Sequence, residues 1–370
     1  MRNFEESFSK KLQQLRKSKK ITQKQFAELL GYSEKTVSKW ECGDAYPPLD
    51  VFAKICRILQ VDSQFLLNYE EEKYILGVDG GGTKTTFLLQ NEEGEVLSCI
   101  TLGPSNPCDI GMNRCQAVLK EGIEKICSGI SMYSVVAYAG IAGCLSGNNK
   151  AILLQFLNTF GFYKVDCGSD NDNIISAGLQ GNDGITVIMG TGVCIFRIIN
   201  GVRTQISGWG YLLDEGGSAF NLGREALSAC YSSLDGSGPY TILAESIGVQ
   251  TDNLGRSFLN RIYAEGKRLI ASFAPNVLEA ANLGDEVALE ILKRNIQIVV
   301  QKLSYAAQIF VDNGQLANVV MTGGLAQHPT IQSMMCNAFE DNDKIRIDIL
   351  KEPPVVGAVR LANLLLAEDI

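Results

Sequence analysis

Histidine is nearly absent from this 370-residue chain, whose only one is His328. A zinc site built on several histidines, or a Ser-His-Asp triad, is therefore excluded unless that single residue serves it. The chain also lacks an apolar run long enough to span a membrane, and its first residues contain no apolar segment typical of a secretory signal. We therefore expect a cytoplasmic protein with no membrane partner.

Paired cysteines are missing as well. The eleven cysteines are scattered singly, and none forms a C-x-x-C pair. In a chain with 46% apolar residues, which can build a sizeable core, this pattern is typical of buried thiols in a reducing compartment. The length is enough for two or three domains.

Charge is unevenly divided along the chain. Residues 1–69 contain 12 basic and 8 acidic residues, a balance of +4, whereas residues 70–370 contain 21 basic and 33 acidic residues, a balance of −12. A small basic head on an acidic body predicts that only the head binds a polyanion such as DNA.

Five short helices are predicted within residues 1–69. Thr22 and Ser33 are suited to cap the second and third helices, and Gly31 ends the second with a left-handed cap. A proline pair opens the fourth helix, and the fifth follows Asp62. Two helices joined by a tight turn at Gly31, in a basic segment, predict a helix-turn-helix.

The motifs "TQKQFA", "GYS" and "VSKWECG" resemble those of the Cro/lambda-repressor-like (XRE) helix-turn-helix family, and the resemblance covers nearly all of residues 8–67. It implies that the third helix enters the major groove of a double-stranded DNA operator. A helical protein-interaction module with an ordinary solvated face is the alternative. The candidate DNA contacts are Gln23, Ser33, Lys35, Thr36 and Lys39.

The segment "YILGVDGGGTKTTFLLQ", residues 74–90, combines glycines with a lysine but fits neither common phosphate loop. Thr83 stands where a Walker A loop requires Lys, and the spacing of a dinucleotide fingerprint is absent. Apolar residues on both sides predict a hairpin with a glycine-rich tip. A second hairpin, "GITVIMGTGVCIFRI" (184–198), has a Gly-Thr-Gly tip, and a later strand breaks at Gly323 and Gly324 before a helix.

Three glycine turns in this order resemble the actin/hexokinase/heat-shock-protein-70 ATPase superfamily, in which two similar lobes clamp a nucleotide. Glycine lets backbone N–H groups approach phosphate oxygens without a Cβ in the way. The candidate nucleotide and phosphate contacts are Asp79, Gly80, Gly81, Gly82, Thr83, Lys84, Gly190, Thr191, Gly192, Gly323 and Gly324; Asp79 would hold magnesium through water.

The expected fold is thus an α/β two-lobed actin-like ATPase with ribonuclease-H-like lobes, preceded by a small all-α five-helix helix-turn-helix domain. The expected boundaries are residues 1–69 for the head, 70–73 for a linker, 74–183 for the first lobe and 184–370 for the second. The C-terminal helix could pack back on the first lobe.

The body also resembles the N-acetylglucosamine kinase family, which belongs with the BadF/BadG/BcrA/BcrD-type ATPases, over about residues 74–360. The matching pieces are "GVDGGGTKT", "GPSNP", "AGIAG", "NDN", "MGTG" and "SGWGYLLDEGGSAFNLGREAL". The resemblance implies ATP-dependent phosphorylation of an amino sugar, with Asp172 as the catalytic carboxylate and Asp170 as the fallback. The candidate sugar contacts are Asn106, Gly208, Trp209, Gly210 and one of two competing acids, Asp214 or Glu215.

Two positions depart from the family pattern, because Val193 replaces a common Ser and Asn173 stands where Ala is usual. Two functions therefore remain open. One is an N-acetylhexosamine kinase coupled to transcriptional regulation, and the other is a regulator whose kinase-like body senses amino sugar without turnover. In either case a homodimer is expected, since lobe closure on ATP and sugar could shift the placement of two DNA-binding heads.

Overall fold

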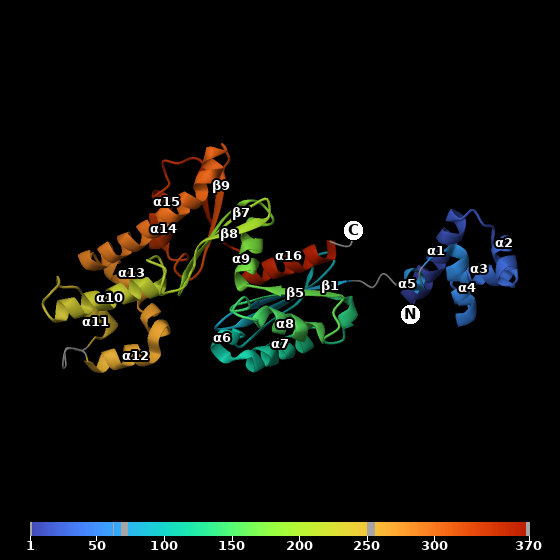
Figure 1. Cartoon of the computed structure of the whole chain (residues 1–370), viewed down its shortest axis with the longest axis horizontal. Helices are drawn as coiled ribbons and strands as arrows, with labels where there is room; N and C mark the ends of the chain where they lie inside the picture. Colours follow the sequence, from blue (N-terminus) through green and yellow to red (C-terminus); the bar gives the residue numbers. More distant parts are fainter. Residues whose placement is uncertain (1, 62, 68–72, 250–255, 368–370) are drawn as a thin grey trace. The chain divides into compact units, whose positions relative to one another are not determined.

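The computed structural model describes residues 2–61, 63–67, 73–249 and 256–367. The chain divides into two compact units, Met1–Lys73 and Tyr74–Ile370, each described here by itself (Figure 1). Of the predicted linker 70–73, residues 70–72 lie outside the described residues.

The first unit contains the five predicted helices. Thr22 forms a capping box with Gln25 at the start of α2, and Gly31, with φ of 78°, ends that helix in the left-handed conformation. All five helices contribute buried apolar side chains to one core, which includes Trp40. The helices are α1 (Arg2–Ser18), α2 (Gln23–Leu30), α3 (Glu34–Cys42), α4 (Leu49–Leu59) and α5 (Ser63–Leu67).

The second unit begins with a five-stranded mixed sheet of order β3-β2-β1-β4-β5. Successive side chains along each strand point to opposite faces of the sheet, so each face packs its own apolar core. Helices α7 and α8 cover one face, and the C-terminal helix α16 covers the other. The elements are β1 (Tyr74–Gly80), β2 (Thr85–Asn91), β3 (Val96–Leu102), α6 (Pro107–Ile110), α7 (Met112–Ile126), β4 (Val135–Ile141), α8 (Asn149–Asn158), β5 (Lys164–Gly168) and α16 (Pro354–Ala367).

A second five-stranded mixed sheet has the order β10-β9-β6-β7-β8. The largest apolar core of the chain lies between one face of this sheet and its helices, including the 27-residue α14. The elements are β6 (Gly184–Met189), β7 (Val193–Ile199), β8 (Val202–Ser207), α10 (Ala219–Leu234), α11 (Leu243–Ile247), α12 (Arg256–Ala271), α13 (Ala274–Asn282), α14 (Glu286–Asp312), β9 (Ala317–Thr322), α15 (Pro329–Asn337) and β10 (Ile345–Ile349).

Helix α9 (Asp170–Leu179) joins the two sheets (Figure 1). It packs against β1 and β4 of the first sheet, β6 and β9 of the second, and α16. Helices α9 and α16 pack so closely that a Cβ at Gly357 would clash with the carbonyl oxygen of Asn173. The N-terminus of α9 therefore lies where both sheets can contribute to one site.

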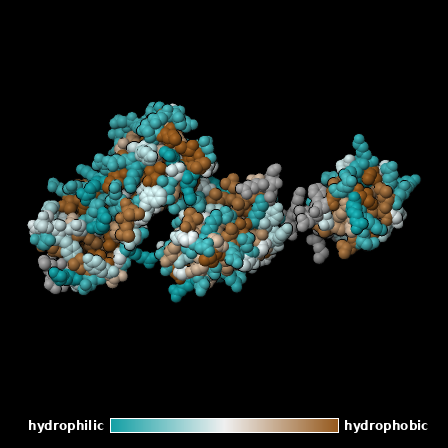
Figure 2. All heavy atoms as spheres, in the orientation of Figure 1, coloured by the Kyte–Doolittle hydropathy of each residue, from teal (hydrophilic) through white to brown (hydrophobic). Residues whose placement is uncertain are grey.

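Membrane insertion has no support in the helices that the structure describes. None of them is both long enough and apolar enough to cross a bilayer. Figure 2 shows hydrophilic residues interspersed with apolar ones over the visible surface of both units.

Candidate functional site

The first predicted phosphate tip, residues 81–84, is the turn of the β1–β2 hairpin, as expected from the sequence. Gly81 N donates to Lys84 O at 2.9 Å and closes the turn. A Cβ at Gly80 would clash with the hydroxyl of Ser105, so glycine lets the hairpin pack on the loop that contains Ser105. Thr83 and Lys84 are exposed at the tip and available to a ligand.

The second predicted phosphate tip, residues 190–192, is the turn of the β6–β7 hairpin. Gly190 N donates to Gly192 O at 2.9 Å, and Gly190 O accepts from Ala219 N at the start of α10. Thr191 and Gly192 are exposed. The two hairpins thus belong to equivalent places in two sheets, since each joins the central strand to its antiparallel neighbour.

The third glycine turn lies beside the second tip, because Leu325 N donates to Met189 O at 3.0 Å. Gly323 has a φ of 100°, and a Cβ there would clash with that same carbonyl. The prediction that Gly323 and Gly324 head a helix is wrong, since α15 begins only at Pro329. The left-handed backbone at Gly323 turns the chain into a loop instead.

Asp79, at the end of β1, is fixed by Asn173 of α9. The Asn173 amide donates to Asp79 Oδ1 at 2.8 Å and also contacts the carbonyl oxygens of Val78 and Gly140. Burial raises the pKa of Asp79 to about 6; the Asn173 amide opposes this shift, and the charge of Asp170 adds to it. The unusual Asn at position 173 thus ties the candidate metal ligand to strands β1 and β4 and to α9.

Asp172 is engaged on both carboxylate oxygens. Its Oδ2 accepts from Ser169 N at 2.8 Å, which completes the capping box of α9, and from Tyr138 OH at 3.3 Å. Its Oδ1 is paired with Arg203 of β8. Asp172 therefore lies inside the first turn of the helix, where three donors hold it in the ligand-free chain.

Asp170 is the other acid in the first turn of α9. Burial raises its pKa, against the opposing hydrogen bond from the Ser169 hydroxyl. Its charge raises the pKa of Asp79 in the first sheet. It also contributes, after burial and Asp214, to raising the pKa of Cys194 in β7 to about 11. The charge of Asp170 is thus coupled to one group at the end of β1 and to another at the start of β7.

The predicted sugar loop, residues 208–210, is shaped by Asp214. This buried carboxylate accepts from Gly208 N at 3.2 Å and from Gly210 N at 2.9 Å. Both glycines have positive φ, near 105–109°. Trp209 between them is 62% exposed. Of the two competing acids, Asp214 organises the loop, whereas Glu215 is exposed and available to a ligand.

Asn106 caps the short helix α6 in the first sheet's loop region. Its Oδ1 accepts from Cys108 N at 3.0 Å, and its Nδ2 donates to Asp109 Oδ2 at 2.9 Å. A Cβ at Gly143 would clash with Asn106 Oδ1, so the "GPSNP" and "AGIAG" motifs meet here. The half-buried Asn106 is therefore held in one orientation before any ligand binds.

In the head, Gln23 belongs to a buried network that the sequence did not reveal. Arg16 binds Glu41 through Nε at 2.5 Å and Nη2 at 2.8 Å, and also donates to Ile21 O. Gln23 Nε2 donates to Glu41 Oε2 at 2.8 Å. The pair holds α1 to α3 and orients the predicted phosphate contact at the start of α2.

The third helix presents two lysines to solvent. Lys35 and Lys39 are exposed one turn apart on α3. Ser33 caps the helix by accepting from Thr36 N at 3.3 Å, and the two hydroxyls lie 2.8 Å apart. The predicted DNA contacts Lys35, Thr36 and Lys39 therefore fall on or beside one face, with Ser33 engaged in the cap.

Metal ligands are sparse in the described part of the body. No group of three or more His, Cys, Asp or Glu side chains there is arranged to hold a metal ion. Asp79 and Asp170 are the two neighbouring acids with raised pKa values. A pair of carboxylates suits magnesium that takes its other ligands from phosphate and water.

Comparison with known proteins gives the same two parts. The BadF/BadG/BcrA/BcrD ATPase family model matches residues 76–362, and a helix-turn-helix family model matches residues 12–66. An N-acetylmuramic acid/N-acetylglucosamine kinase of Clostridium acetobutylicum is 29% identical over 304 residues, which cover 79% of this chain and 98% of that kinase.

Two further relatives are informative. The HTH-type transcriptional activator BcrR of Enterococcus faecalis is 44% identical over 64 residues, which cover 17% of this chain and 31% of BcrR. A solved Chromobacterium violaceum protein assigned as an N-acetylglucosamine kinase has a TM-score of 0.64 at 22% identity, covering 79% of this chain and 99% of that one. This likeness confirms the expected two-lobed actin-like fold. The chain therefore belongs to the BadF/BadG/BcrA/BcrD ATPase family and carries an N-terminal helix-turn-helix domain.

Proposed function

We propose that the chain is an ATP-dependent kinase of an N-acetylhexosamine whose head binds an operator in double-stranded DNA. The observation that carries the proposal is the pair of glycine-tipped hairpins at equivalent places in the two sheets, with helix α9 packed against the central strand of each sheet. The similarity to the Clostridium kinase over nearly its whole length supports the substrate class.

In this proposal the sugar hydroxyl attacks the γ-phosphorus of ATP. Asp170 accepts its proton in preference to Asp172, the acid expected from the sequence, because three donors already engage Asp172. The new O–P bond forms as the bond to the ADP oxygen breaks. The raised pKa of Asp170 suits a proton acceptor, because a base works best when its pKa approaches the working pH. Backbone N–H groups of the two tips, apart from those of Gly81 and Gly190 that close the turns, would bind the phosphates, while Gly323 and Gly324 would border the adenosine.

Magnesium would be held by Asp79, through water, with Asp170 close by. Both carboxylates are buried enough to raise their pKa values, and a divalent cation would compensate that charge. The ion would neutralise charge on the β- and γ-phosphates. In the ligand-free chain, the Asn173 amide holds the Asp79 carboxylate by donating to its Oδ1.

The sugar would lie against residues 208–210. The exposed ring of Trp209 offers a flat apolar surface for one face of a pyranose, and Glu215 offers a free carboxylate for its hydroxyls. Asp214 contributes indirectly by fixing the loop that carries Trp209. Asn106 would donate from the first-sheet side, in an orientation already set by its cap.

Sensing without turnover is the second candidate, and Val193 favours it. This residue is buried directly after the second phosphate tip, where the family commonly has a hydroxyl side chain. In both candidates a homodimer would couple sugar binding to the placement of two heads on DNA, in the cytoplasm.

A coupled ADP-release screen over hexoses and N-acetylhexosamines separates the candidates. Turnover with an N-acetylhexosamine supports the kinase. Sugar binding without ADP release, accompanied by a change in operator affinity in fluorescence anisotropy, supports the sensor. If neither release nor sugar binding occurs, the proposed substrate class is wrong.

A further inference from the structure

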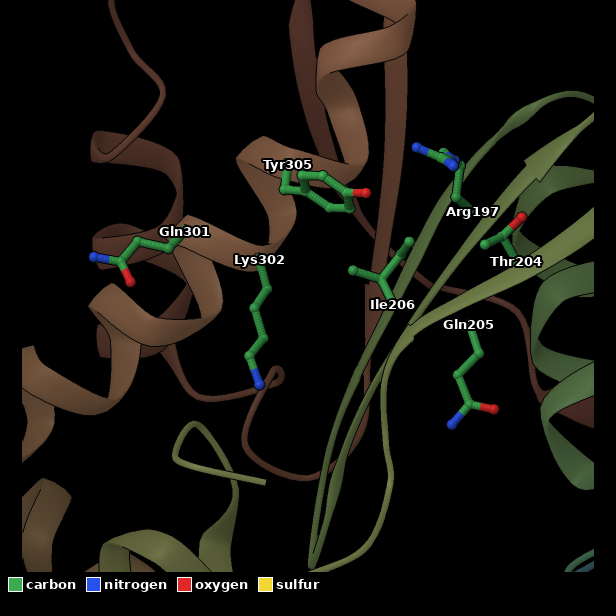
Figure 3. Close-up of a pocket in the computed structure, with 7 residues that line it drawn as sticks. All are labelled: Arg197, Thr204, Gln205, Ile206, Gln301, Lys302 and Tyr305. Carbon is green, nitrogen blue, oxygen red and sulfur yellow. The ribbon is translucent and has the colours of Figure 1, made fainter. Parts of the chain in front are cut away.

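A pocket of about 410 Å³ lies between strands β7 and β8 and helix α14, apart from every residue assigned above (Figure 3). Arg197 extends from β7 toward the helix, and Tyr305 extends from α14 toward the strands, whereas the side chain of Lys302 points away from these two (Figure 3). Thr204 pairs directly with Arg197 in the β7–β8 register, so it lies on the same face. Ile206 provides an apolar wall.

Two positive charges in this pocket have no negative partner. Among the described residues, no ion pair reaches Arg197 or Lys302, and no acidic side chain lines the pocket. The Nε of Arg197 is buried without a hydrogen-bond partner. A buried donor of this kind is unfavourable unless something accepts from it. This cationic pocket is set in a body whose net charge is −12, so bulk composition does not explain it.

We propose that this pocket binds a small phosphorylated metabolite. A guanidinium presents paired donors that match phosphate oxygens, the hydroxyl of Tyr305 can add another donor, and Lys302 contributes a further positive charge to the pocket. The volume is within the range of about 300–1,000 Å³ that small-molecule sites occupy, and it exceeds what a phosphate group alone fills. The ring of Tyr305 and the side chain of Ile206 would contact the organic part.

The walls of the pocket connect it to the predicted sugar loop. Strand β8 runs directly into Gly208, and Gln205 Nε2 donates to Gly208 O at 3.0 Å. Helix α14 holds the other end of the segment, because Asn295 Oδ1 accepts from Gly217 N at 2.9 Å. A ligand that bridges β7, β8 and α14 would therefore restrain the sugar loop. This coupling, unlike the binding itself, rests on the proposed function.

The experiment is isothermal titration calorimetry on the full chain with N-acetylglucosamine and a non-hydrolysable ATP analogue present at saturation, so that the proposed kinase site is filled. The probes are N-acetylglucosamine 6-phosphate and, separately, inorganic phosphate. We expect saturable binding of the sugar phosphate, weakened at least about tenfold by Arg197→Gln and by Lys302→Gln. Lys293→Gln, an exposed position on the same helix, should leave it unchanged.

The outcomes separate the two sources of phosphate. Equal binding of inorganic phosphate, with the same dependence on Arg197 and Lys302, assigns the pocket to the free ion and overturns the organic part of the proposal. Absence of binding, or binding indifferent to both substitutions, overturns it altogether. Because Lys302 lies on the helix surface, Lys302→Gln does not threaten folding. Failure of the ADP-release screen would leave this binding result standing.

Discussion

Replacing Asp170 by Asn removes the proposed proton acceptor while keeping the size of the side chain. A general base contributes about 10²–10⁴ in rate, equivalent to roughly 2.7–5.4 kcal/mol of barrier. Asp170→Asn should therefore lower kcat at least about a hundredfold, with the KM for ATP little changed, because the phosphate-binding backbone groups are untouched.

Asp172→Asn is the matched control, two residues away in the same helical turn. Its amide oxygen can still accept from Ser169 N and preserve the cap. The substitution loses the ion pair with Arg203, whose side chain is 36% exposed against 24% for Asp172, so the loss is worth about 0–1 kcal/mol. We expect kcat to change less than about fivefold.

A coupled ADP-release assay across pH measures both variants, with circular dichroism melts as the check on folding. Because the pKa of Asp170 is raised, kcat/KM of the unaltered chain should begin to fall, as the pH is lowered, at a higher pH than an ordinary Asp would give. The opposite result, an inactive Asp172→Asn beside an active Asp170→Asn, would refute the inference that a capped and ion-paired carboxylate is unavailable as a base.

Three other predictions concern the metal ligand and the head. Burial favours the protonated form of Asp79, so its charge destabilises the ligand-free fold above its pKa of about 6 but not below about pH 4. Asp79→Asn should therefore raise the free energy of unfolding at pH 7.5 by at most about 3 kcal/mol and leave it unchanged at pH 4, as measured by calorimetry. Glu41→Gln leaves Arg16 buried without its counter-charge and should destabilise the head by about 3 kcal/mol in thermal melts. Lys35→Ala and Lys39→Ala should each reduce the slope of log DNA affinity against log salt concentration by about one, the value for one lost phosphate contact, as measured by fluorescence anisotropy.

Controls for these predictions come from exposed positions. Glu121→Gln breaks an exposed pair with Lys125 and should change stability by less than about 0.5 kcal/mol. An equal gain at pH 4 and pH 7.5 for Asp79→Asn would show that its charge is not the destabilising factor. Unchanged salt dependence in both lysine variants would place the DNA on another face of the head.

Much of the fold was predictable because its signals are local. Thr22, Gly31 and Ser33 set helix ends through hydrogen bonds within four residues, and the caps of α2 and α3 formed as predicted. The glycine tips of both hairpins were likewise visible as short motifs between apolar runs. The start of α15 was missed, because the turn after Gly323 depends on its contact with Met189, which is distant in sequence.

The sequence by itself determined the two-part organisation, the helix-turn-helix, the paired hairpins and the family. Only the tertiary structure decided which partners the two acids of "DND" meet. Side chains two positions apart on a helix point in different directions, so the packing of α9 between the sheets brings Asp172 to Tyr138 and Arg203, whereas Asp170 accepts from the Ser169 hydroxyl. The pocket at Arg197 and Lys302 arises in the same way, since residues about a hundred positions apart meet only when α14 covers β7 and β8.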